Sequence, residues 1–333
     1  MSYIPPFTIS TKAINLIAEI SGQIERYAIH LEQEDTLLLR KVNRIKTIQG
    51  SLAIEGNRLT EGQITDIVDG KHVVAPIREI QEVRNAIRTY DAYSSLNPFL
   101  MRDLQKAHKL MMEALVDDAG CFRKGGVGVF AGNEVIHVAP PADRVPTLLH
   151  DLFEWLEHSE DHLLIKSSVF HYEFEFIHPF SDGNGRIGRL WQSLLLGKLH
   201  PLFEHLPIEN MVFANQQGYY SAINRSSKNT DCGVFIDFML QEILHALKMR
   251  QGEALIKNVG VNVGVNVGEN EGGILAMIHL NNRISVKSIA EQLHLSTRQV
   301  ERILTGLKKK GYLNRIGGAK GGHWELSGNF LSL

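Results

Sequence analysis

Apolar residues recur at spacings of three and four over much of the chain, which predicts a mainly α fold. The pattern over 35–55, for example, places Leu38, Val42 and Ile45 on one face, and Gly56-Asn57 ends it. Helices are predicted over 11–31, 35–55, 79–96, 99–115, 145–158, 186–199 and 234–254.

Two short β-rich runs interrupt this helical pattern between residues 127 and 138. They surround Gly132-Asn133, a pair typical of hairpin turns, and prolines follow the second run directly. The sequence therefore predicts a β-hairpin at 127–138.

The stretch 168–177 fits two kinds of element. Its aromatic residues alternate as in a strand, whereas Phe170, Phe174 and Ile177 also fit one face of a helix. Periodicity alone leaves both interpretations open.

The last quarter of the chain has a different organisation. An Asn/Gly-rich segment over 256–272 is predicted to be an interdomain linker, although its valines also allow a strand. Three short helical patterns follow, and then a Gly-rich tail between β-like ends. Three helices and such a hairpin predict a small winged helix-turn-helix domain over 273–333.

Length and composition fit a two-domain soluble protein. The 333 residues are 44% hydrophobic and 22% charged, which is ordinary for globular chains. Cys121 and Cys232 lie in no metal or redox spacing, so we expect two small apolar residues in a reducing compartment. No run approaches the ~20 apolar residues of a membrane span, and the N-terminus lacks an export pattern. We expect a cytoplasmic protein without a membrane partner.

The charge is distributed unevenly. Residues 273–333 carry a net charge of +6, while the remainder carries −8. A basic small domain on an acidic body suggests an anionic partner for that domain.

Positive charge also stands where a helix does not favour it. Arg186 and Arg189 fall in the first turns of a predicted helix, where the macrodipole already presents positive charge. Directly before them, the amides of Gly183-Asn184-Gly185 can approach a ligand closely. This pattern indicates a site for more than one phosphate; the alternative is a solvated helix start whose arginines pair with nearby carboxylates.

Two further side chains make the phosphate interpretation more specific. His178 is near enough to act as a general base, and Asp182 offers a carboxylate suited to Mg²⁺. The glycines at 183, 185 and 188 also match a dinucleotide-binding fingerprint, but no apolar strand precedes them. We therefore do not expect a Rossmann fold.

The segment His178-Pro-Phe-Ser-Asp-Gly-Asn-Gly-Arg-Ile-Gly-Arg189 resembles the Fic family motif, His-Pro-Phe-x-Asp/Glu-Gly-Asn-Gly-Arg-x-x-Arg. The resemblance extends over about residues 35–250. It implies a helical core with a β-hairpin flap, and transfer of AMP from ATP to a Ser, Thr or Tyr hydroxyl of a target protein or of the protein itself. The expected domains are N-terminal helices (1–60), a Fic catalytic core (61–255), the linker (256–272) and the winged helix (273–333).

The resemblance also implies roles for individual residues. His178 would be the base, Asp182 the Mg²⁺ ligand, and Arg186 and Arg189 the contacts of the β- and γ-phosphates. The hairpin at 127–138 would align the target by strand addition. The α- and β-phosphates would be held by Gly183, Asn184 and Gly185, and the adenine would lie near Tyr219 and Tyr220, which could equally be packing residues.

A second segment, Ser51-Leu-Ala-Ile-Glu55-Gly56, resembles the inhibitory motif of the same family. Ser51 and Glu55 share a helix face, and Glu55 stands at a helix C-terminus, where the dipole disfavours an acid. The misplaced acid and the misplaced arginines suggest each other as partners. The resemblance implies that Glu55 pairs with Arg189 and restrains AMP transfer; removal of AMP from a modified protein is the reverse reaction on the same residues.

A regulator that binds DNA and only senses the nucleotide is the alternative function. The segment 296–302 resembles a recognition helix with Ser296 as N-cap, and Arg298, Gln299 and Arg302 would face bases. Lys308–Lys310 and Lys320 would contact phosphates, and specific binding would need a homodimer. Winged helices also dock proteins, and we favour such a docking or regulatory role. The intact His178 favours catalysis over sensing.

Overall fold

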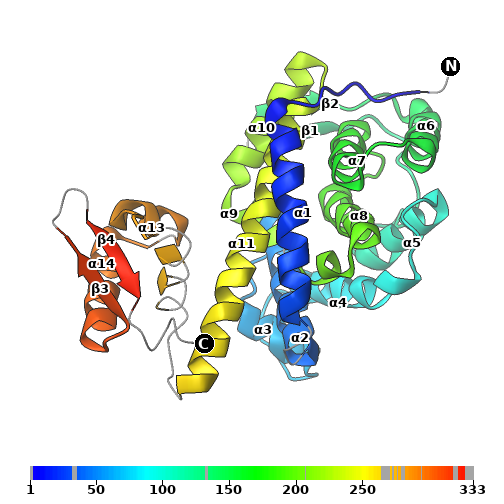
Figure 1. Cartoon of the computed structure of the whole chain (residues 1–333). Helices are drawn as coiled ribbons and strands as arrows, with labels where there is room; N and C mark the ends of the chain where they lie inside the picture. Colours follow the sequence, from blue (N-terminus) through cyan, green and yellow to red (C-terminus); the bar gives the residue numbers. More distant parts are fainter. Residues whose placement is uncertain are drawn as a thin grey trace. The chain divides into compact units, whose positions relative to one another are not determined.

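The computed structural model describes residues 3–31, 36–131, 134–206, 208–263, 271, 274–275, 277–278, 282–293, 295–317 and 322–326. The chain divides into two compact units, Met1–Ala246 and Leu247–Leu333. Figure 1 shows the elements of both units.

The first unit is built from α-helices, with short 3₁₀ segments at Tyr93–Ser95, Ala142–Arg144 and Pro201–His205. The mainly α fold predicted from the sequence is confirmed. The helices are α1 (Thr11–Leu31), α2 (Thr36–Ile54), α3 (Glu61–Val68), α4 (Ile77–Asp91), α5 (Met101–Met112), α6 (Val145–His158), α7 (Leu163–Ile177), α8 (Asn184–Leu199), α9 (Ile208–Ala214), α10 (Gln216–Asn229) and the part of α11 (Gly233–Val263) up to Ala246.

Helices α7 and α8 pack along each other in the middle of this unit (Figure 1). Nearly every side chain of α7 is buried, and Phe170, Phe174 and Trp191 are fully buried in the core around the pair. A helix that is enclosed on all sides carries apolar residues around its whole circumference and not on one stripe, and α7 does so although it also buries Lys166, His171 and Glu173. That is why the aromatic residues of 168–177 also alternate as in a strand, and the structure decides for the helix.

Several boundaries differ from the expected ones. The helices α3, α9 and α10 were not predicted, and α8 begins at Asn184, two residues before the predicted start. The short α3 forms because Thr60 and Gln63 make a capping box at its start. Helix α11 continues to Val263, so the first part of the expected linker is helical, and 264–270 lie outside the described residues.

The predicted hairpin consists of β1 (Gly128–Ala131) and β2 (Glu134–Val138), which pair antiparallel. Gly128 lies opposite Val138, and the register shifts between Val129 and Phe130. The expected turn residues Gly132-Asn133 lie outside the described residues. The amide of Ala139 donates to Val127 O over 3.2 Å, which closes the base of the hairpin.

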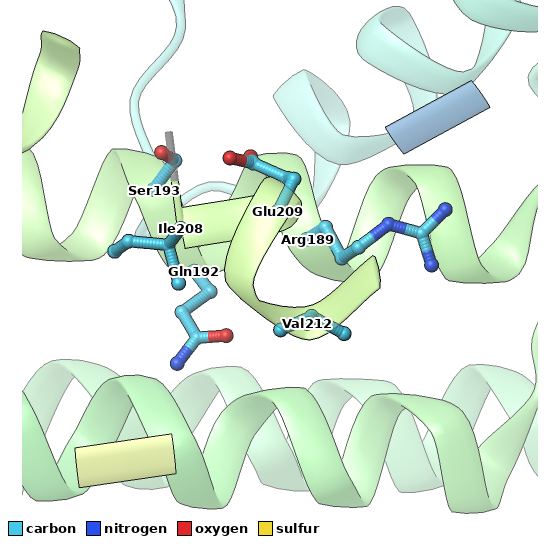
Figure 2. Close-up of a pocket in the computed structure, with 6 residues that line it drawn as sticks. All are labelled: Arg189, Gln192, Ser193, Ile208, Glu209 and Val212. Atoms are coloured by element: carbon cyan, nitrogen blue, oxygen red, sulfur yellow. The ribbon is translucent and has the colours of Figure 1, made fainter. Parts of the chain in front are cut away.

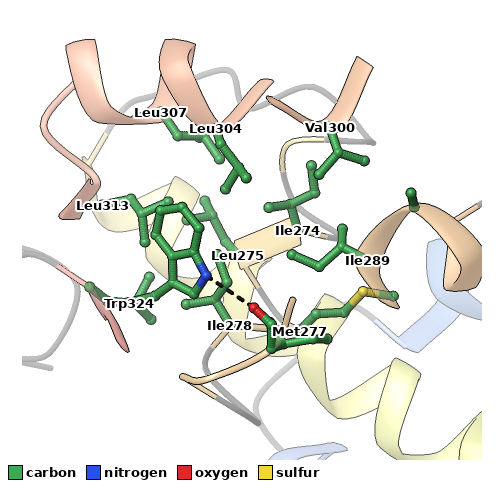
Figure 3. Packing of buried hydrophobic residues seen from close by; sticks show 13 residues of the cluster. Ile274, Leu275, Met277, Ile278, Ile289, Val300, Leu304, Leu307, Leu313 and Trp324 are labelled. Atoms are coloured by element: carbon green, nitrogen blue, oxygen red, sulfur yellow. Dashed lines mark hydrogen bonds between the residues drawn. The ribbon is translucent and has the colours of Figure 1, made fainter. Parts of the chain in front are cut away.

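The second unit contains α13 (Val286–Gln292), α14 (Thr297–Lys309) and the antiparallel strands β3 (Leu313–Ile316) and β4 (His323–Leu326). Residues 271, 274–275 and 277–278 are also helical. Figure 3 shows the small apolar core of the second unit, in which Trp324 Nε1 donates to Ile284 O over 3.2 Å. These elements confirm the winged helix-turn-helix; Lys320 lies outside the described residues.

None of the helices in the described residues is long and apolar enough to cross a membrane.

Candidate active site

The turn between α7 and α8 brings His178 next to the N-terminus of α8. His178 ends α7 in the left-handed conformation (φ 50°), which is uncommon for a residue with a side chain. The side chain of Asn184 closes this turn, since it accepts from Phe180 N and donates to Phe180 O, both over 2.9 Å. The side-chain amide of Asn184 is therefore engaged within the turn, and its contact with a phosphate stays a prediction.

The start of α8 has the geometry of an anion site. Gly183 precedes the helix at φ 83°, and a Cβ there would lie 2.6 Å from Met112 Sδ, so only glycine fits. The first amides of a helix have no acceptor within the helix. The amides at the start of α8 are therefore the groups to which an anion would bind.

Arg186 is a buried cation whose hydrogen-bonding capacity is partly unused. It is 3% exposed, and its Nη2 lies 3.2 Å from Asp182 Oδ1. Its Nη1 lies 3.8 Å from Glu82 Oε1, which is ion-pair distance only. Within the described part of the chain, Nε and Nη1 have no hydrogen-bond partner. Buried donors without acceptors are costly, so this side chain is suited to receive an anionic ligand.

Arg189 is held by the end of α2. Its Nη2 lies 2.8 Å from Glu55 Oε1 and 2.9 Å from Ser51 O, and its Nε donates to Ser51 Oγ over 3.2 Å. The pairing expected from the two misplaced charges is present. A Cβ on Gly185 would lie 2.5 Å from Glu55 Oε1, so the glutamate occupies the space beside the first turn of α8.

Two further acids near Arg189 were not predicted from the sequence. Burial raises the pKa of Glu175 to about 7, and that of Glu209 likewise to about 7, while the Arg189 charge acts in the opposite direction on both. Tyr90 Oη donates to Glu209 Oε1 over 3.4 Å. Glu173 and Glu175 stand between aromatic residues of α7, and acids in so apolar a stretch are a signal that could have identified Glu175.

A small pocket adjoins this cluster. Figure 2 shows the guanidinium of Arg189 extending away from Gln192 and Ser193 of the same helix. Glu209 contributes its side chain from α9, so buried polar groups continue from Arg189 into the core. The lining residues are Arg189, Gln192, Ser193, Ile208, Glu209 and Val212.

The imidazole of His178 is mostly buried, with 19% of its side chain exposed. Its Nδ1 lies 3.9 Å from Glu175 Oε2, one turn earlier on α7. Its backbone carbonyl accepts from Arg123 Nε over 2.7 Å. The base predicted from the sequence therefore lies at the α8 N-terminus with its main chain fixed.

Asp182 is the residue expected to hold Mg²⁺. Its side chain is 41% exposed and lies 3.5 Å from Arg78 as well as 3.2 Å from Arg186. No three His, Cys, Asp or Glu side chains of the described residues form a metal cluster. Mg²⁺ usually takes one or two carboxylates, with substrate phosphates and water as its other ligands, so a single accessible carboxylate at an anion site fits.

The two tyrosines expected near the adenine differ in their surroundings. Tyr219 is 2% exposed, and its hydroxyl lies 2.9 Å from His171 Nε2 within the core. Burial lowers the pKa of His171 to about 4, so this imidazole is neutral. Tyr220 is only partly buried. Of the pair, Tyr220 is therefore the better candidate to contact a nucleotide.

Comparison with known proteins assigns both units. The model of the Fic/DOC family matches residues 95–196, and that of a winged helix-turn-helix DNA-binding family matches residues 269–314. A probable protein adenylyltransferase of Aquifex aeolicus is 32% identical over 108 residues, and the protein adenylyltransferase Fic of Nematostella vectensis is 26% identical over 207 residues. These matches cover 32% and 58% of this chain, and 31% and 45% of the relatives, so the chain spans less than half of their length.

A solved structure matches nearly the whole chain. The crystal structure of a Fic family protein from Desulfovibrio desulfuricans G20 has 41% sequence identity and a TM-score of 0.72. The match covers 98% of this chain and 99% of that protein. With the motif assembled as described, the chain belongs to the Fic family.

Proposed function

We propose that the protein is an adenylyltransferase that moves AMP from ATP to a Ser, Thr or Tyr hydroxyl of a protein, with this protein itself among the targets. One observation carries the proposal: Arg186 is buried with unused donors at the N-terminus of α8, beside His178. The curated relatives named protein adenylyltransferase support the same activity. ATP and a protein target are the substrates, and the unpaired thiol at Cys121 fits a cytoplasmic setting.

The chain's own groups account for each step. The first amides of α8 and Arg186 bind the inner phosphates, and Arg189 contacts the terminal one. His178 accepts the proton of the target hydroxyl while the hydroxyl oxygen forms a bond to the α-phosphorus. The bond from that phosphorus to the bridging oxygen breaks, and pyrophosphate leaves. When bound, Mg²⁺ would be held by Asp182 and would neutralise phosphate charge.

We further propose that Glu55 restrains the transfer. Its carboxylate holds Arg189 at 2.8 Å and lies in the space beside Gly185, where an incoming phosphate would need room. Ser51 supports the same state, since it binds the same guanidinium through two oxygens. The reverse reaction, removal of AMP from a modified protein, would use the same groups.

The test is to incubate the purified protein with α-labelled ATP and Mg²⁺, alone and with cell lysate. We expect labelled protein, and a loss of about 10²–10⁴-fold for His178→Ala, the range usual for a general base. ATP binding should persist in this variant because the base acts on the incoming hydroxyl. A folded His178→Ala protein that labels at the normal rate would show that the assignment is wrong.

We propose DNA binding as a second function for residues 273–333. The match to a DNA-binding family supports it, and so does the exposure of Arg298 and Arg302 on α14. Ser296 caps that helix in a capping box with Gln299, as in the recognition helix expected from the sequence. Recognition of an operator would then require a homodimer. Docking of a protein, the role favoured by the sequence alone, is the competing outcome.

A further inference from the structure

Arg123 makes an unusual set of contacts outside the motif. It precedes the hairpin, and its side chain is buried, at 4% exposure. Among the described residues, all its hydrogen-bond partners are backbone carbonyls. Nε donates to His178 O over 2.7 Å, Nη1 to Gly125 O over 2.8 Å, and Nη2 to Pro140 O over 2.5 Å and to Ile177 O over 3.2 Å.

These four carbonyls belong to two separate parts of the unit. Gly125 and Pro140 flank the β1–β2 hairpin on its two sides, while Ile177 and His178 end α7. The backbone amide of Arg123 adds a fifth bond, to Pro179 O over 2.9 Å. One residue therefore joins both sides of the flap base to the main chain of the catalytic histidine.

The chemistry of arginine suits this junction. Its planar guanidinium presents five donors in a fixed fork, whereas the ammonium of lysine is a single compact group on a flexible stem. A buried cation without an opposing carboxylate is costly to desolvate. The four carbonyls offset that cost, and an apolar residue of the same size would leave them without this donor, so the contacts indicate a geometric role.

The segment that Arg123 holds includes the strained backbone of His178. That residue has a φ of 50°, and its amide is bonded to Phe174 O while its carbonyl is bonded to Arg123. Such a conformation persists only where the surroundings fix it. Arg123 thus contributes to the conformation that orients the imidazole.

We propose that Arg123 is a positioning residue that fixes the base of the flap to His178, so that a target strand paired with the flap presents its hydroxyl to the imidazole in one register. The inference rests on the proposed AMP transfer. Register matters because a slip of one residue along a strand turns the side chain to the opposite face. Without this anchor the flap still forms, but it presents the target in several positions relative to the base.

Arg123→Lys tests the proposal because it keeps the charge and removes the fork. We expect faster hydrogen exchange of the flap amides, Ala139 above all, and at least a tenfold loss of kcat for the target. ATP affinity should stay within about twofold, because the α8 site is unaltered. The matched control is Arg44→Lys. Arg44 Nη2 donates to Ile87 O over 2.7 Å and lies 2.7 Å from Asp91 Oδ1, and neither partner belongs to the flap, α7 or α8, so this variant should change none of these quantities.

A measurement on the wild-type protein keeps the proposal testable if Arg123→Lys does not fold. Native-state exchange in low denaturant should show the amides of Ala139 and His178 opening together, with one opening free energy. Separate openings, or an unchanged flap in a folded Arg123→Lys protein, would overturn the anchoring. A normal kcat despite a loosened flap would overturn the positioning role. A wild-type protein without AMP transfer would instead refute the proposed function, while the exchange results still decide the anchoring.

Discussion

Two helices of this chain, one in each unit, carry a pair of arginines near their N-terminus. The two pairs differ in how far their side chains are buried. In α8, Arg186 and Arg189 are 3% and 4% exposed and lie among acids from α2, α4 and the motif itself. In α14, Arg298 and Arg302 are exposed at the surface. The first pair is preorganised and the second is solvated.

Under the proposed functions, the two pairs would bind two kinds of anionic ligand. Buried, oriented cations select a ligand of fixed size and are little screened by salt. Exposed arginines bind phosphates along a polymer by displacing counterions, so their contribution depends steeply on salt. Binding by the two arginine pairs should therefore respond differently to salt and to substitution.

The largest expected difference is in salt dependence. With about four phosphate contacts, DNA affinity of the full chain should fall about a hundredfold between roughly 50 and 200 mM salt. ATP affinity of the same sample should change far less, since Arg186 and Arg189 are buried. Fluorescence anisotropy and calorimetry over one salt series measure both. Absence of DNA binding at the lowest salt would instead favour protein docking.

Arg186→Ala should weaken ATP binding about 10- to 100-fold, because a hydrogen bond to a charged group contributes about 1.5–3 kcal/mol. Arg88→Ala is the control: Arg88 forms an ion pair with Glu113 on the surface, and such pairs contribute little. Calorimetric titration with ATP compares the two variants. Equal ATP affinities of the two variants would contradict a nucleotide site at the start of α8.

Glu55→Gly should raise AMP transfer severalfold or more, since it releases Arg189 without adding a catalytic group. Ser51→Ala should produce a smaller increase, because it removes only the hydroxyl contact and leaves Glu55 in place. Initial rates with α-labelled ATP rank the three proteins. A folded Glu55→Gly protein with unchanged or lower transfer would argue against restraint, and loss of AMP removal there would assign Glu55 to the reverse reaction.

The smallest effect concerns stability and pH. Burial raises the pKa of Glu209 from 4.5 to about 7, so the folded state binds this proton more tightly than the unfolded state. Its contribution to stability is complete below about pH 4.5 and is lost as pH rises to about 7. Between those pH values, the free energy of unfolding of Glu209→Gln should therefore rise by about 1–3 kcal/mol relative to that of the wild type.

Tyr90 and Arg189 face the Glu209 carboxyl and should be unaltered in this comparison. Urea unfolding at several pH values measures the gain. A difference between Glu209→Gln and wild type that does not vary with pH would contradict the raised pKa.

Local sequence predicted the features that depend on neighbouring residues. Helix α6 has the predicted bounds, and the Glu55–Arg189 pair followed from two charges placed against helix dipoles. The helices α3, α9 and α10 escaped because two are only one or two turns long and the third is strongly polar. Short or polar helices take their stability from tertiary packing, which a periodicity does not contain.

Long-range contacts were the other limit. Tyr219 stands beside Tyr220 in the sequence, and its surroundings are set by distant partners such as His171, forty-eight residues earlier. Arg123 is equally ordinary in the sequence, since its partners are backbone carbonyls that any residue provides. The motif identifies the reacting groups, whereas the groups that hold them depend on how α7, α8 and the hairpin meet.

In the restraint proposed above, Glu55 would act as an intramolecular competitor of the nucleotide, because Gly185 has no side chain to displace its carboxylate. If Glu55 restrains transfer as proposed, its carboxylate and an anion bound at the first turn of α8 would exclude each other, because the carboxylate lies directly beside Gly185. Its effective concentration depends on how firmly the end of α2 is held, and Asn57 Nδ2 ties that end to Glu82 over 2.9 Å. A partner that loosened this tether would raise the apparent ATP affinity without contacting any catalytic group. Control would then act through the effective concentration of the Glu55 carboxylate at the start of α8.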